Sequence, residues 1–235
     1  MTHIEIEKNI PEENFTGIIK RPINRRNFLA FTGISAVALT LGLQSCSDDP
    51  VTSSGFIDVG RGDIGVLNYA YALEQLEAAF YVKVASAFYT GATSEEIQIL
   101  TDIREHEIAH REFFKAALGA SAIQALEVNF DSINFTNRAS VLATAKTFED
   151  LGVSAYNGVA YIIQDVTYLG LAGKIVSVEA RHAAAISDLI NPRSIAFAND
   201  TIINAAGLEL TNTPQAVVTA ANGFLKTKIS ANNLA

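Results

Sequence analysis

The chain has 235 residues, of which 49% are apolar and only 18% charged, with a net charge of -8 and a pI near 5.0. This acidic balance excludes a protein that binds nucleic acid through a basic surface. The single cysteine, Cys46, excludes internal disulfides and cysteine-based zinc sites, so a metal site would need carboxylates and imidazoles. Beyond the N-terminal segment no apolar run reaches 18 residues, which excludes a polytopic membrane protein.

Residues 1–45 have the pattern of an export signal. The run Arg25-Arg26-Asn27-Phe28-Leu29 opens an almost uncharged apolar stretch that ends at residue 43, and it resembles the twin-arginine signal, which carries folded proteins. Residues 43–46 resemble a bacterial lipobox, which implies that Cys46 is acylated, and we expect residues 46–60 to form a flexible tether. The sequence therefore predicts an exported lipoprotein, anchored to a membrane in the periplasm or at the cell surface.

Apolar residues at helical spacing predict four long helices, over residues 63–89, 93–118, 138–163 and 167–190. Thr93 and Glu96 form a capping-box pattern at the start of the second helix. Residues 120–137 lose the periodicity and form a long connection, and the extension 192–235 contains a short helix that opens at Pro214. The sequence shows no convincing set of paired strands, so we predict an all-α four-helix bundle over 61–191 with one long crossover.

Ligand-type residues repeat within the predicted bundle. Two of the histidines after Cys46 stand three residues behind a glutamate, as Glu107-x-x-His110 and Glu179-x-x-His182. Glu77 precedes Glu107 by 30 residues, and Glu149 precedes Glu179 by 30, so three positions recur at an offset of 72. The predicted turns lie midway along each interval, so each pair of glutamates meets at one height on antiparallel helices.

The sequence leaves open what Glu74, Tyr81 and Tyr156 do near the predicted ligands. Glu74 lies on the same helix face as Glu77, but the residue 72 positions beyond it is Lys146, so the repeat favours Glu77. Tyr81 and Tyr156 follow Glu77 and Glu149 and are candidates for hydrogen-bond donors or electron relays, although such tyrosines more often only fill a core.

Two glutamates and two Glu-x-x-His pairs on four helices resemble the ferritin-like di-metal carboxylate superfamily. Residues 73–81, 105–110, 148–156 and 178–183 are similar to the exported ferritin-like domain of bacterial proteins and of plant desiccation-related proteins. The resemblance implies six metal ligands, with Glu107 and Glu179 bridging two ions: Glu77, Glu107, His110, Glu149, Glu179 and His182. Two divalent Fe or Mn ions would cancel the four carboxylate charges.

Centres of this kind react with dioxygen or peroxide, so we expect Fe(II) oxidation or peroxide removal. The expected partners are these small molecules and, through Cys46, a membrane. The sequence leaves open whether the chain also forms a homodimer.

A second hypothesis is a zinc hydrolase, because His106-Glu107-x-x-His110 matches the zinc-protease motif, although the second copy has Val178 in place of the first histidine. If His106 is not a ligand, it is a neighbour of the centre or an exposed residue. A third hypothesis is a scaffold without catalytic activity.

Overall fold

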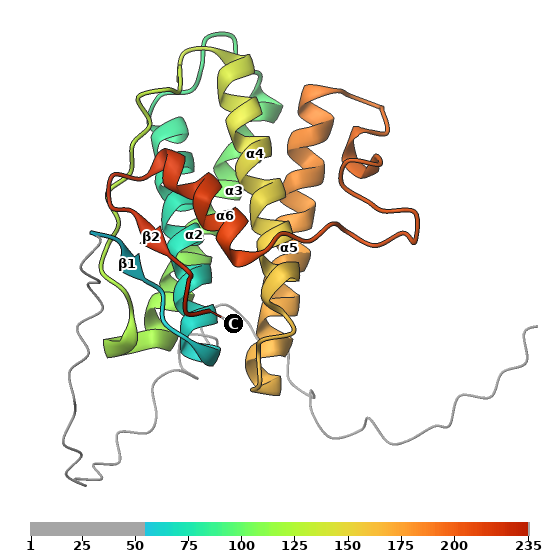
Figure 1. Ribbon diagram of the computed structural model, residues 1–235. Helices are drawn as coiled ribbons and strands as arrows, with labels where there is room; N and C mark the ends of the chain where they lie inside the picture. The colour runs from blue at the N-terminus through green and yellow to red at the C-terminus, as the bar shows by residue number, and fades with distance from the viewer. Residues whose placement is uncertain (1–54, 235) are drawn as a thin grey trace, which may run out of the picture. The chain divides into compact units, whose positions relative to one another are not determined.

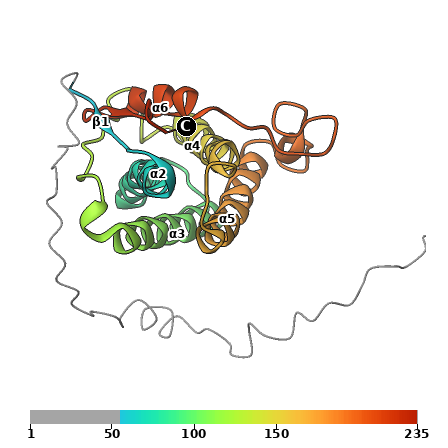
Figure 2. The same ribbon diagram turned by 60° about the horizontal axis from the view of Figure 1, so that its bottom comes forward.

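The computed structural model describes residues 55–234, so the predicted export signal and Cys46 lie outside the described residues. Four long helices form the body of this part of the chain (Figure 1): α2 (Gly62–Ser86), α3 (Ser94–Leu118), α4 (Arg138–Val159) and α5 (Val166–Ile190). They pair most closely as two hairpins, α2 with α3 and α4 with α5, and Figure 2 shows the four nearly end-on around a common core. The predicted all-α four-helix bundle is confirmed.

Three of the four bundle helices, α3, α4 and α5, begin where side-chain caps satisfy their first backbone N–H groups. Thr93 and Glu96 form the predicted capping box of α3, in which each side chain accepts from the other residue's backbone N–H. Asn137 caps α4 and Asp165 caps α5 in the same way, through a side-chain oxygen. Of the four predicted ends, that of α4 differs most, because the helix stops at Val159 rather than at residue 163.

The predicted crossover connects the end of α3 to the start of α4 along the side of α2. It begins with the 3-10 turn η1 (Gly119–Ser121), and Asn68 of α2 bonds both Ser121 and the backbone of Ile123. Further along, Gln75 accepts from the backbone N–H of Leu126. The crossover therefore covers the outer face of α2, which explains why this helix is buried on most of its surface.

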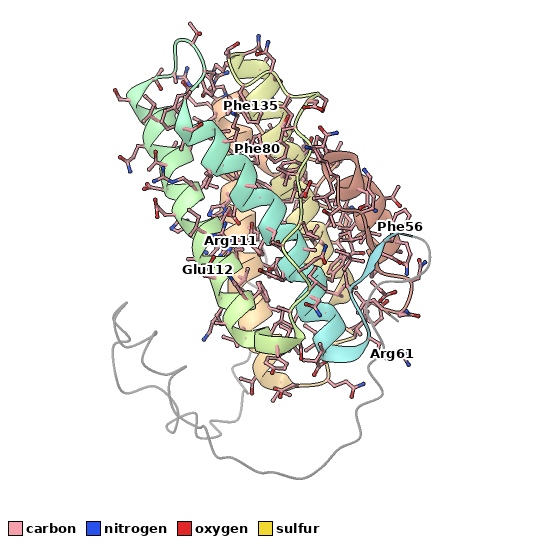
Figure 3. All side chains as sticks on the ribbon, turned by 90° about the vertical axis from the view of Figure 1, so that its left-hand side faces the viewer. Phe56, Arg61, Phe80, Arg111, Glu112 and Phe135 are labelled. Carbon is pink, nitrogen blue, oxygen red and sulfur yellow. The ribbon has the colours of Figure 1, made fainter. Side chains whose placement is uncertain are left out.

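Aromatic rings fill the core at the end of the bundle where α2 finishes. Phe80 of α2 contacts the rings of Phe130, Phe135 and Phe148, with centroids between 5.2 and 6.1 Å apart. Figure 3 shows Phe80 and Phe135 near one end of α2 and Arg61 at the other. Such edge-to-face contacts add to the free energy gained by burying the rings, so this end of the core is tightly packed.

The C-terminal segment returns to the bundle after an excursion over residues 191–213 that contains the 3-10 turn η2 (Ala196–Ala198). The helix predicted to open at Pro214 is α6 (Pro214–Ala221), which packs on α4. After η3 (Asn222–Phe224), strand β2 (Ile229–Ser230) pairs in parallel with β1 (Ile57–Asp58). Because β1 lies inside the range 46–60 expected to be a tether, the ordered domain begins earlier than that boundary.

Among the described residues, no helix combines the length and the apolar character that a membrane span requires.

Candidate metal centre

Six donor residues lie near the midpoints of the four bundle helices. They are Glu74 of α2, Glu107 and His110 of α3, Glu149 of α4, and Glu179 and His182 of α5. Because the helices are antiparallel and similar in length, their midpoints meet at one height. All four carboxylate residues are fully buried, so the core of an otherwise apolar bundle contains a cluster of acidic groups.

The donor atoms form two groups that share Glu107 and Glu179. The first group adds Glu74 and His110, and the second adds Glu149 and His182. Within each group, one donor atom from every residue lies within 4.8 Å of all the others. Each group therefore offers three carboxylates and one imidazole, and the shared carboxylates are placed to bridge two cations.

The contacts of the first group recur in the second. His110 Nδ1 lies 2.8 Å from Glu179 Oε1 and 3.4 Å from Glu74 Oε2. His182 Nδ1 lies 2.8 Å from Glu107 Oε1 and 3.5 Å from Glu149 Oε2. The two hairpins thus supply equivalent halves of one centre, with each imidazole facing the bridging glutamate of the other hairpin.

Two buried tyrosines donate hydrogen bonds to Glu74 and Glu149, the two glutamates that are not shared between the groups. The Tyr156 hydroxyl of α4 donates to Glu74 Oε1 of α2 at 2.5 Å, and the Tyr81 hydroxyl of α2 donates to Glu149 Oε1 of α4. Each bond uses one carboxylate oxygen and leaves Oε2 facing the centre. The tyrosines therefore fix the orientation of these two carboxylates, and they cross-link α2 and α4.

The donor atoms that face the centre form no hydrogen bond among the described residues, and the ion-pair contacts of their imidazoles are with carboxylates of the same cluster. Eight atoms are concerned: Oε2 of Glu74, both oxygens of Glu107, Nδ1 of His110, Oε2 of Glu149, both oxygens of Glu179 and Nδ1 of His182. A buried polar atom without a partner costs about 1 to 3 kcal/mol, and more if it is charged. Two divalent cations would satisfy all eight atoms and cancel four negative charges, so the residues present fit a di-metal centre.

Burial and mutual repulsion shift the protonation of the cluster. Burial is the largest cause that raises the pKa of Glu107 well above its usual range and that of Glu149 to about 7. Burial opposes the charged forms of His182 and Glu179, but contacts with groups of opposite charge outweigh it. Glu107, Glu149 and Glu179 raise the pKa of His182 to about 12, and His110 and His182 lower that of Glu179 to about 2. Protons therefore compensate the clustered carboxylates when cations do not.

His106 contacts the centre from outside rather than within either group. Its Nδ1 lies 2.9 Å from Nε2 of His182, and the two rings are stacked, with an angle of 7° between their planes. His182 turns its other nitrogen, Nδ1, to the carboxylates, so a hydrogen bond to His106 fixes its tautomer and its ring orientation. The residue equivalent to His106 in the other hairpin is Val178, so His110 has no such neighbour at that position.

The structure brings five of the six residues implied by the resemblance together and leaves Glu77 outside both groups. Glu74 takes the place that the repeat suggested for Glu77. Glu77 is buried one turn further along α2, and its Oε1 lies 3.0 Å from the position that a Cβ atom on Gly152 would take. The missing side chain of Gly152 makes room for this additional carboxylate.

A second spacing in the sequence identifies Glu74. Glu74 and Tyr81 are seven residues apart, as are Glu149 and Tyr156, so α2 and α4 match at an offset of 75. The offset of 72 holds only for α3 and α5, which carry the Glu-x-x-His pairs. The paired glutamate and tyrosine, rather than the distance between glutamates, was the signal for the α2 glutamate that joins a donor group.

The model of the ferritin-like domain family matches residues 62–192, which include all four bundle helices and every donor described above. The comparison with curated proteins returned no match.

Proposed function

The chain belongs to the ferritin-like domain family, and we propose that it holds two Fe or Mn ions between its four long helices and carries out redox chemistry with them. The observation that carries this proposal is the set of eight buried donor atoms without hydrogen-bond partners, which fall into two groups around shared carboxylates. Mixed carboxylate and imidazole donors suit Fe and Mn, whereas thiolate ligands favour Cu(I) and Zn and sites made only of oxygen ligands favour Mg and Ca.

The chemistry expected of these ions is electron transfer to a small oxidant, either Fe(II) oxidation or peroxide removal. In the first reaction, two bound Fe(II) ions would each supply one electron, and dioxygen would take both electrons and two protons to become hydrogen peroxide. With peroxide as oxidant, the same two electrons and two protons convert it to two water molecules. The chain's part is to keep bulk water out, to orient Glu74 and Glu149 through the two tyrosines, and to fix His182 through His106.

The location of this chemistry is part of the proposal. The twin-arginine pattern and the lipobox at Cys46 support an exported lipoprotein. A bundle that folds and acquires its ions before export fits a signal that carries folded proteins. Detection of the acylated protein in the membrane fraction, and its loss in Cys46→Ala, would test this part separately.

Metal analysis of the full chain tests the proposed centre. We expect about two Fe or Mn ions per chain, and we expect Glu107→Ala combined with Glu179→Ala to abolish both metal binding and Fe(II) or peroxide turnover. The matched control is Glu112→Ala, which removes an exposed glutamate from α3. Unchanged metal content in the double variant would overturn the proposal.

The zinc hydrolase is a separate candidate with its own outcome. It requires His106 and His110 to bind one ion, whereas His106 contacts the outer nitrogen of His182. One Zn per chain that is lost in His106→Ala but kept in Glu149→Ala would favour it over the di-metal centre.

A further inference from the structure

An apolar cavity of about 130 Å³ lies at the end of the bundle where α2 and α5 begin and α3 and α4 end. Thirteen residues line it, ten of them apolar, and all four bundle helices contribute. Ala70 of α2, Phe114 of α3, and Ala172 and Ile175 of α5 are among them. In Figure 1 this end is the lower one.

Tyr156 separates the cavity from the metal centre. Its ring forms part of the cavity wall, while its hydroxyl donates to Glu74 Oε1. A molecule in the cavity is therefore one side chain away from a proposed metal ligand. No other residue among the six donors or the two tyrosines lines this space.

The cavity offers few partners to a polar molecule. Both carboxylate oxygens of Asp63 accept from the backbone N–H groups of Gln164 and Asp165, and the Tyr156 hydroxyl is bonded to Glu74. Among the lining side chains this leaves the Tyr168 hydroxyl, whereas an ordered buried water needs about two to four polar partners. The cavity therefore favours a small nonpolar occupant; an apolar cavity of about 150 Å³ in another protein stays dry and binds benzene or xenon.

The opposite end of the bundle is filled at the equivalent positions. The offset of 72 relates Ala172 of α5 to Leu100 of α3, and Leu100 is fully buried. Likewise the offset of 75 relates Val66 and Leu67 to Val141 and Leu142, which are at most 1% exposed. Alanine in place of leucine thus contributes to the space at this end of the bundle.

We propose that this cavity binds dioxygen and supplies it to the metal centre past Tyr156. The inference rests on the proposed function and narrows it, because it makes dioxygen rather than hydrogen peroxide the oxidant that uses this route. Dioxygen is nonpolar and loses little on leaving water, whereas peroxide would leave its hydrogen bonds unmade in the cavity. The reaction served is the two-electron one, in which two Fe(II) ions reduce dioxygen, with two protons, to hydrogen peroxide.

Xenon, a nonpolar atom that is easily located by its scattering, tests the cavity directly. We expect crystals of the metal-free full chain under xenon pressure to show an atom beside Ala172 and Ile175. Ala172→Leu copies the side chain that the other half accommodates and should abolish xenon binding. Ala116→Leu, at an exposed position on α3 outside the cavity, should leave it unchanged. Ordered water in the cavity, or no xenon in the unmodified chain, would overturn the proposal.

Oxidation kinetics test the route. With Fe(II) bound, Ala172→Leu should slow oxidation by dioxygen several-fold and leave oxidation by hydrogen peroxide unchanged, while Ala116→Leu should alter neither rate. Equal slowing with both oxidants, or no slowing with dioxygen, would contradict the inference. Absence of bound metal would instead refute the proposed function, whereas an empty cavity in a chain that binds two ions would refute only the further inference.

Discussion

Glu74 and Glu77 stand one turn apart on α2, yet only Glu74 has its carboxylate fixed by a tyrosine and directed at His110. We expect Glu74→Ala to lose one of two bound ions, because the group built around His110 then keeps only the two shared carboxylates and one imidazole. Glu77→Ala should keep both ions. Elemental analysis of the two purified variants measures the difference, and the reverse result would restore the ligand that the offset of 72 suggested.

Protonation of the donors makes metal binding depend on pH. Because Glu149 has a pKa of about 7, it carries a proton below neutral pH that must leave before the carboxylate can bind a cation. The pKa of His182, about 12, means that its Nδ1 must also lose a proton in the neutral range. Both groups must lose a proton before they bind the ion. The affinity for Mn(II) should therefore rise with pH, about tenfold per unit for each proton released.

Titration of the chain with Mn(II) on either side of neutral pH, with the released protons followed in a weakly buffered solution, measures this coupling. A dissociation constant that is independent of pH, with no proton release, would show that the donors are already deprotonated and would contradict the expected direction.

At the level of whole elements, Gly158 is where α4 touches the segment that leads into α6. A Cβ atom at Gly158 would lie 1.9 Å from the carbonyl oxygen of Asn212, so Gly158→Ala forces backbone apart. We expect this substitution to lower the free energy of unfolding by about 1 to 3 kcal/mol, despite the better helix propensity of alanine.

Gly173→Ala is the matched control, because Gly173 also lies inside a long helix but has nothing within 4 Å of the added atom. It should stabilise the protein by up to about 1 kcal/mol. Urea denaturation of the two variants compares them, and equal effects would mean that the contact between Gly158 and Asn212 is absent in solution.

Most of the elements could be predicted because their signals are local. The capping box at Thr93 and the proline at residue 214 each mark the start of a helix within one turn of the chain. The pairing of β1 with β2 could not be predicted, since each strand has only two residues and the partners are separated by nearly the whole domain.

The structure places Glu74 rather than Glu77 in a donor group for a geometric reason. The sequence argument assumed hairpins of equal length, whereas α2 continues twelve residues beyond Glu74 and α4 only ten beyond Glu149. The connection over residues 87–93 is also one residue longer than that over 160–165. The two extra helix residues and the one extra connection residue account for the difference between the offsets of 72 and 75. They are the reason why the sequence argument expected Glu77 rather than Glu74 as the ligand.

For the molecule as a whole, the centre should couple metal content to stability. Each ion that binds only the folded chain stabilises it by about 2.7 kcal/mol at a free concentration one hundred times its Kd. For a domain of this size, that corresponds to about 5 to 10 °C in Tm. Thermal unfolding with and without a chelator should show this shift, and the Glu107→Ala and Glu179→Ala double variant should show none. A chelator-insensitive Tm in the unmodified chain would argue against bound ions.

The pairing of β1 with β2 also determines which parts of the domain can be completed first while the chain is being synthesised. All six donor residues leave the ribosome well before residues 229 and 230, which give β1 its only partner strand among the described residues. Leu234, whose side chain lies against Gly65 at the start of α2, emerges later still. A nascent chain therefore contains its complete donor set while Ile57 and Val59 are still uncovered. Products terminated before residue 229 would contain the complete donor set yet expose these apolar residues, a state that quality-control proteases recognise.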